Sequence, residues 1–142
     1  MGILIDTCIW VDVERGSLSP ADVAALTKGE PVFLSPVTIA ELKFGAENAK
    51  DPNIRQKRLA ALARLKKKPV LLINEVTGEI FGDLAAQIAR TGTRHQHRVL
   101  DLWIASQAIQ YGFPLLTHNL KDFADIPGLQ LMSLGKAHRA KR

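Results

Sequence analysis

Short apolar runs alternate with longer segments of helical pattern along almost the whole chain. Such runs, rich in Ile, Leu and Val and bounded by polar or turn residues, indicate buried strands. We expect strands at residues 3–5, 32–34, 69–73, 115–117 and 129–132. Strands that alternate with helices predict an α/β fold with a mainly parallel sheet. In such a sheet the functional crevice lies beyond the carboxyl ends of the strands.

Serine–proline pairs mark the starts of two helices. Ser19-Pro20 and Ser35-Pro36 each combine a favourable N-cap with a proline at the first helical position. The remaining pattern predicts helices at 10–14, 20–28, 36–48, 53–68, 76–90 and 100–111, and a helical turn at 120–124. Residues 94–98 are expected to form a basic loop.

Length and charge indicate one domain with a basic balance. The chain has 142 residues, with 19 Lys and Arg against 14 Asp and Glu, and a formal net charge of +5. We assign residues 1–134 to a single domain and expect the basic tail, 135–142, to be flexible. The positive balance favours a polyanionic partner without requiring one.

Several classes of protein are excluded by what the chain lacks. Its one cysteine, Cys8, cannot form an internal disulfide or a thiolate zinc site, which favours a reducing compartment. The first residues include no basic segment of a secretory signal. Residues 102–120 carry no full charge, but Gly112-Phe113-Pro114 interrupts them, so we expect no membrane span. A cytoplasmic location follows as an expectation.

Four acidic residues fall where the crevice is expected. Asp6 follows the first strand, and Glu41 lies in the second helical turn after the strand at 32–34. Asp122 lies beyond the strand at 115–117, and Asp101 stands at the start of a helix that could reach the same edge. Carboxylates that converge repel one another unless a cation offsets their charge. Oxygen ligands without thiolates select Mg²⁺ or Mn²⁺, which can promote phosphodiester hydrolysis. The pattern therefore favours a metal-dependent nuclease.

Each of these residues also has a purely structural interpretation. Asp6 could simply end a strand, and Glu41 could lie on a solvated helix face. Asp101 could be an N-cap, and Asp122 could form a turn with Asn119. Only their joint placement supports the nuclease hypothesis.

The chain resembles PIN-domain ribonucleases, and most closely the VapC-type toxins of bacterial toxin–antitoxin pairs. The motifs that carry the resemblance, in order, are Ile5-Asp6-Thr7, Ser35-Pro36-Val37-Thr38-Ile39-Ala40-Glu41-Leu42, Asp101-Leu102-Trp103-Ile104-Ala105 and Leu116-Thr117-His118-Asn119-Leu120-Lys121-Asp122-Phe123. The resemblance covers nearly the whole chain, from Ile3 to about Met132. The resemblance implies a PIN-like three-layer sandwich, with a mainly parallel central sheet flanked by helices.

The same resemblance implies an endoribonuclease with an acidic quartet of Asp6, Glu41, Asp101 and Asp122, holding Mg²⁺ or Mn²⁺. By analogy, Asp6 and Asp101 bind the principal ion, and Asp122 acts through water or a second ion. Glu41 would orient the attacking water or accept its proton. The small polar residues of these motifs, Thr7, Thr117 and Asn119, would support the acids. The implied products carry 5′-phosphate and 3′-hydroxyl ends.

The implied biology is that of a toxin that inhibits translation by cutting RNA, with tRNA and rRNA as alternative targets. A VapB-type antitoxin would neutralise it, and the chain would form a homodimer. One departure from the family is the segment 94–100, which is more basic than the usual loop. The alternative is a catalytically degenerate PIN module that binds RNA or protein.

Basic residues outside the quartet are candidates for RNA contact. Lys57, Arg64 and Lys68 are expected to share one helix face, although a solvated face is the plainer interpretation. Arg94 and Arg98 lie close to Asp101 in sequence and are stronger candidates. If the four acids converge in one pocket, 19 basic residues face only 10 other acidic ones on the rest of the molecule.

Overall fold

The computed structural model describes residues 2–133, so the predicted flexible tail at 135–142 lies outside the described residues. Four short strands form its sheet: β1 (Ile3–Ile5), β2 (Val32–Phe33), β3 (Leu115–Leu116) and β4 (Leu131–Met132). They are ordered β2-β1-β3-β4, and every neighbouring pair is parallel. The predicted α/β fold with a mainly parallel sheet is therefore confirmed.

One predicted strand is wrong. The run 69–73 forms a single parallel bridge, between Val70 and Leu34, and then leaves the sheet. Leu71 is buried in the core, but Leu72 is 70% exposed and Ile73 is also exposed, so the end of this apolar run lies outside the core. Strand propensity describes a fit to a pleated, half-buried surface, and the chain turns away before it can provide that surface.

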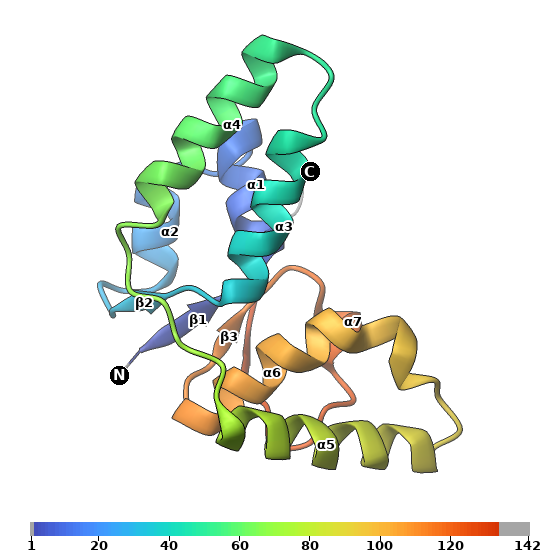
Figure 1. Ribbon diagram of the computed structural model, residues 1–142. Helices are drawn as coiled ribbons and strands as arrows, with labels where there is room; N and C mark the ends of the chain where they lie inside the picture. The colour runs from blue at the N-terminus through green and yellow to red at the C-terminus, as the bar shows by residue number, and fades with distance from the viewer. Residues whose placement is uncertain (1, 134–142) are drawn as a thin grey trace.

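Seven α-helices and one 3₁₀ helix connect the strands within the described residues (Figure 1). Their bounds are α1 (Thr7–Arg15), α2 (Pro20–Leu26), α3 (Pro36–Glu47), α4 (Pro52–Leu65), α5 (Glu75–Arg90), η1 (His95–Arg98), α6 (Val99–Tyr111) and α7 (Leu120–Phe123). The two serine–proline starts are confirmed, since Ser19 caps α2 and Ser35 caps α3. The expected basic loop at 94–98 is largely the helix η1.

The first helix begins earlier than its pattern predicted. We expected a helix at 10–14, but α1 starts at Thr7, directly after β1. Asp6 is the reason, because its carboxylate accepts a hydrogen bond from the Thr7 backbone N–H and caps the helix. The strand therefore passes into the helix through a single acidic residue.

Helices cover both faces of the sheet and give a three-layer sandwich. Side chains alternate along β1, so Leu4 packs into one core cluster, while Ile3 and Ile5 pack into the other. The Leu4 cluster includes residues of α5 and α6, and the Ile3–Ile5 cluster includes residues of α1 and α2. In Figure 1, α3 and α4 form an antiparallel pair on the α1 side of the sheet. None of the helices in residues 2–133 is long and apolar enough to span a membrane.

Candidate active site

A cleft of about 560 Å³ opens beyond the carboxyl end of the sheet. Three of the four predicted acids line it: Asp6 after β1, Glu41 from α3 and Asp101 from α6. Thr7, Cys8 and Asn119 line the same cleft. The expectation that residues far apart in sequence meet at this edge is therefore realised for these acids.

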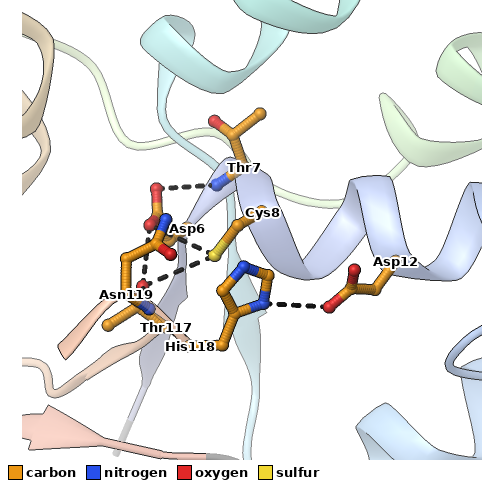
Figure 2. A network of polar contacts seen from close by, with 7 residues as sticks. All are labelled: Asp6, Thr7, Cys8, Asp12, Thr117, His118 and Asn119. Carbon is orange, nitrogen blue, oxygen red and sulfur yellow. Dashed lines mark hydrogen bonds and ion pairs between the residues drawn. The ribbon is translucent and has the colours of Figure 1, made fainter. Parts of the chain in front are cut away.

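Asp6 forms the buried floor of the cleft (Figure 2). Its Oδ1 accepts from the Thr7 N–H at 2.8 Å, and its Oδ2 accepts from the Thr117 hydroxyl at 2.8 Å. Burial raises the pKa of Asp6 against the lowering effect of these hydrogen bonds, and the charge of Asp122 raises it further. In the described part of the chain, no cationic side chain pairs with this carboxylate.

Glu41 reaches the cleft from an exposed position on α3. The Thr7 hydroxyl donates to Glu41 Oε1 at 2.7 Å, and the Thr38 hydroxyl lies 2.9 Å from that of Thr7. This short chain of hydroxyls ties the start of α1 to α3. It fixes the direction of a carboxylate that would otherwise move freely in solvent.

Asp101 is the third residue of α6 and is partly buried. Burial and then the charges of Asp6, Asp122 and Glu41 raise its pKa to about 6, with the Arg98 guanidinium opposing the shift. Asp101 therefore lies close enough to the other three predicted acids for their charges to act on it. Arg98, and not Asp101, holds the N-cap position of α6, so the purely structural interpretation of Asp101 as a cap is wrong.

Asp122 stands apart from the other three. It lies on the short helix α7, is exposed, and is not part of the cleft lining, although its charge acts on Asp6 and Asp101. Its helix is held by Arg98, whose guanidinium donates to the Asp122 carbonyl oxygen at 2.7 Å. The same guanidinium makes two hydrogen bonds to the Asp125 carboxylate, at 2.8 and 2.7 Å. Arg98 thus acts as a clamp between α6 and α7.

The remaining predicted polar residues support Asp6. Thr117 is fully buried and also accepts the Asn119 backbone N–H at 3.0 Å, which shapes the turn after β3. The Cys8 thiol lies 3.4 Å from both Asp6 Oδ2 and Thr117 Oγ1. Burial and the charge of Asp6 raise the pKa of Cys8, so it stays a thiol at neutral pH. This agrees with a packing role for Cys8.

The comparison with known proteins assigns the family. A model of the PIN domain matches residues 3–129. The chain belongs to the PIN-domain family. It is 33% identical over 139 residues to Ribonuclease VapC of Rickettsia bellii, which covers 94% of this chain and 97% of that relative. Ribonuclease VapC1 of Rickettsia felis is 34% identical with the same coverage.

Solved structures place this PIN domain among VapC proteins. The VapBC2 complex of Rickettsia felis, bound to promoter DNA, contains a chain that matches with a TM-score of 0.80 and 25% identity. That match covers 95% of this chain and 100% of the other. VapBC-1 of Haemophilus influenzae matches with a TM-score of 0.78 and 27% identity, over 94% and 98%. The predicted PIN-like sandwich is confirmed.

Another polar pair of this PIN domain lines the same cleft and was not predicted. The His118 Nδ1 lies 2.9 Å from Asp12 Oδ2, and Asp12 is buried on α1 (Figure 2). The sequence placed His118 inside the motif that ends at Asp122 but assigned it no role. The pair spans 106 positions, and no local pattern could have revealed it.

The basic residues of this PIN domain lie in two places. Lys57, Arg64 and Lys68 line a second hollow of about 950 Å³, among residues of α1, α2, α3 and α4. Lys68 is not on the helix face that we predicted, because α4 ends at Leu65; its ammonium lies 5.8 Å from the centre of the Trp10 ring. Arg94 is exposed just before η1, whereas the guanidinium of Arg98 is occupied by Asp125 and Asp122.

Proposed function

We propose that the chain is a metal-dependent endoribonuclease that hydrolyses RNA phosphodiester bonds with the quartet Asp6, Glu41, Asp101 and Asp122. The main support is the carboxylate cluster itself. Three members line one cleft, and the fourth raises the pKa of two of them. A cluster of like charges that fold so close together is expected where a cation is to be bound.

The donors fit a hard divalent ion by their chemistry. Carboxylate and hydroxyl oxygens surround the cleft floor, and the one sulfur there, that of Cys8, is held as a thiol. No three His, Cys, Asp or Glu side chains in residues 2–133 already surround a single point, so no preformed cage supports the assignment. We assign Asp6, Asp101 and Asp122 as ligands of Mg²⁺ or Mn²⁺. When bound, such an ion lowers the pKa of water and offsets charge on phosphoryl oxygens.

Residues of the chain itself prepare the reaction. Thr117 and the Thr7 N–H hold the Asp6 carboxylate in a fixed direction. The Thr7 hydroxyl directs Glu41, which we assign to orient the attacking water and accept its proton. Because Glu41 is exposed, it can release that proton to solvent after each turnover.

The comparisons support a toxin. Relatives of the chain include ribonucleases VapC, and one from Salmonella typhimurium, 30% identical over 99 residues, is a tRNA(fMet)-specific endonuclease VapC. Similar structures are VapBC complexes. We infer that this chain inhibits translation in the cytoplasm by cutting tRNA or rRNA, and that a VapB-type antitoxin neutralises it. The predicted homodimer stays a prediction; Leu72, Ile73 and Val76 are exposed apolar residues available to such an interface.

Purified protein distinguishes the proposed nuclease from the alternative, a catalytically degenerate PIN module that only binds RNA or protein. We expect the chain to cut total RNA with Mg²⁺ or Mn²⁺ and to stop when the ion is chelated. Asp101→Asn should reduce cleavage at least about 100-fold, because it removes a charged ligand while keeping the side-chain shape. Cleavage is measured on gels, and circular dichroism checks the fold. Chelator-resistant cleavage would contradict the metal assignment, whereas RNA binding without cleavage would favour the module.

A further inference from the structure

The cleft continues beyond the carboxylates along α1. Its lining at that end includes Asp12, Arg15, Ser17 and His118. Asp6 caps α1 and Arg15 is its last residue, so the two ends of the cleft are separated by about 13 Å along the helix axis. The acidic end therefore does not fill the cleft, and the far end has a different chemistry.

His118 is directed by Asp12. The Asp12 side chain is buried, and a buried carboxylate needs a hydrogen-bonded partner, which the imidazole Nδ1 supplies at 2.9 Å. A carboxylate accepts hydrogen bonds only, so Nδ1 carries the proton. In Figure 2 no dashed line reaches Nε2, and no hydrogen bond within the described residues engages it. His118 is 17% exposed and lines the cleft, so this nitrogen is accessible to a ligand.

Arg15 adds a permanent charge at the same end. It follows Asp12 by three residues, which places the two on neighbouring positions of one helix face. Arg15 is exposed, and no hydrogen bond or ion pair within residues 2–133 occupies its guanidinium. It lines the cleft with donors that match the oxygens of a phosphate.

We propose that Arg15 and His118 bind a second backbone phosphate of the RNA strand, further along the strand from the phosphate that is cleaved at the acidic end. This rests on the proposed function. A polyanion is repelled by the carboxylates and needs cationic contacts beyond them, and phosphate contacts dominate the affinity of proteins for nucleic acid. Asp12 acts as a positioning residue, which keeps Nε2 facing the phosphate. In the imidazolium form, flanked by Asp12 and the phosphate, Nε2 donates to a phosphate oxygen.

The test separates binding from chemistry in variants that keep the local structure. Arg15→Gln removes the guanidinium, and Arg90→Gln is its matched control, because Arg90 is likewise the basic residue in the last turn of its helix. His118→Asn keeps an amide N–H in place of Nδ1 for Asp12 and removes Nε2. Dissociation constants are measured by fluorescence anisotropy with a short fluorescein-labelled oligoribonucleotide of mixed sequence, in an Asp101→Asn background with a chelator present to suppress residual cleavage. Cleavage kinetics are measured with Asp101 restored.

For Arg15→Gln we expect KM and Kd to rise about tenfold with kcat within about twofold. The slope of log Kd against log salt should fall by about 0.7, as for the loss of one phosphate contact on a single strand. His118→Asn should raise Kd and KM several-fold with kcat retained, and Arg90→Gln should change nothing. These readouts do not follow from a merely structural role.

Two outcomes overturn the proposal. An unchanged Kd and salt slope in Arg15→Gln would show that this end of the cleft does not hold RNA, and would leave an acidic protein partner as its ligand. A fall in kcat at constant KM in His118→Asn would make His118 an acid–base group instead. Should His118→Asn lose its thermal transition, Arg15→Gln and its salt slope decide the proposal. Failure of the proposed function looks different, because the parent protein would then cut no RNA.

Discussion

Asp6 and Asp12 are two carboxylates of the same cleft that are buried in different ways, one at the N-cap of α1 and one within that helix. Both are 5% exposed, and Asp12 lies six residues after Asp6. Asp6 is held by neutral donors, namely hydroxyl, thiol and backbone N–H groups, and the negative charge of Asp122 acts on it. Asp12 is instead paired with the imidazole of His118.

The difference separates a site from a structural contact. A buried carboxylate that has a partner depends on it, so removing either member of the pair is costly. A buried charge held by neutral groups among other carboxylates is more stable once a cation arrives. The two ends of the cleft should therefore respond to substitution in opposite ways.

The largest expected effect comes from exchanging each carboxylate for its amide. Asp6→Asn should lower kcat at least about 100-fold while retaining the fold, because Asn also caps helices well and can accept the Thr7 N–H. Asp12→Asn should keep kcat within about twofold, raise KM less than tenfold, and lower the free energy of unfolding by about 1–2 kcal/mol. Cleavage assays and urea unfolding measure both. If Asp12→Asn abolished turnover and Asp6→Asn did not, the contrast between the two carboxylates would be wrong.

The position of Asp6 could be predicted from the sequence, and the partner of Asp12 could not. An apolar strand followed directly by an acid gives a carboxylate at the carboxyl edge of a parallel sheet. Glu41 was expected there from the helix after its strand, and Asp101 from the start of its own helix, and both line the cleft. The contacts Asp12–His118 and Arg98–Asp125 join residues 106 and 27 positions apart. Such pairs depend on packing between elements, which single-sequence periodicity does not encode.

The ends of strands and helices were also predicted incompletely from the sequence. The run 69–73 had the composition of a strand, but its hydrogen bonds to the sheet stop after those that join Pro69 and Leu71 to Leu34. The start of α1 was missed because Asp6, which closes the predicted strand at 3–5, is also the cap of the helix. In both cases a tertiary contact or a cap overrode local propensity.

The second prediction concerns Arg98, whose positive charge acts near the acidic end. Arg98 acts on Asp101 electrostatically, but its donors are taken by Asp125 and the Asp122 carbonyl. Arg98→Gln should release α7 and lower kcat about tenfold, because Asp122 then loses its fixed position. Asp125→Asn should have a similar but smaller effect, since Arg98 can still donate to the carbonyl.

A double-mutant cycle tests the clamp directly. If Arg98 and Asp125 act through each other, the variant that carries both Arg98→Gln and Asp125→Asn should have about the same kcat as Arg98→Gln alone. Purely additive losses in kcat would indicate that Arg98 serves Asp101 or the RNA directly. Arg90→Gln again serves as the control for loss of a surface charge.

The smallest expected effect is that of Asp101→Asn on the free energy of unfolding. Its sign is opposite to that expected for Asp12→Asn. The pKa of Asp101 is raised to about 6, so between about pH 4 and 6 the folded protein keeps a proton that the unfolded chain has released. Stability therefore falls as pH rises through this window, by about 1–2 kcal/mol once solvent screening is allowed for. Asp101→Asn should remove this fall and stabilise the metal-free protein at neutral pH, whereas Asp12→Asn destabilises it.

Urea unfolding with a chelator, at about pH 4 and about pH 7, measures the difference between wild type and Asp101→Asn. Adding Mn²⁺ at neutral pH should then stabilise the wild type more than the variant, because only the wild type retains every carboxylate assigned to the ion. An equal dependence of the unfolding free energy on pH in the two proteins would mean that burial and the neighbouring charges do not raise the pKa of Asp101. The acidic end of the cleft would then resemble the Asp12 end, and the distinction between the two carboxylates would be lost.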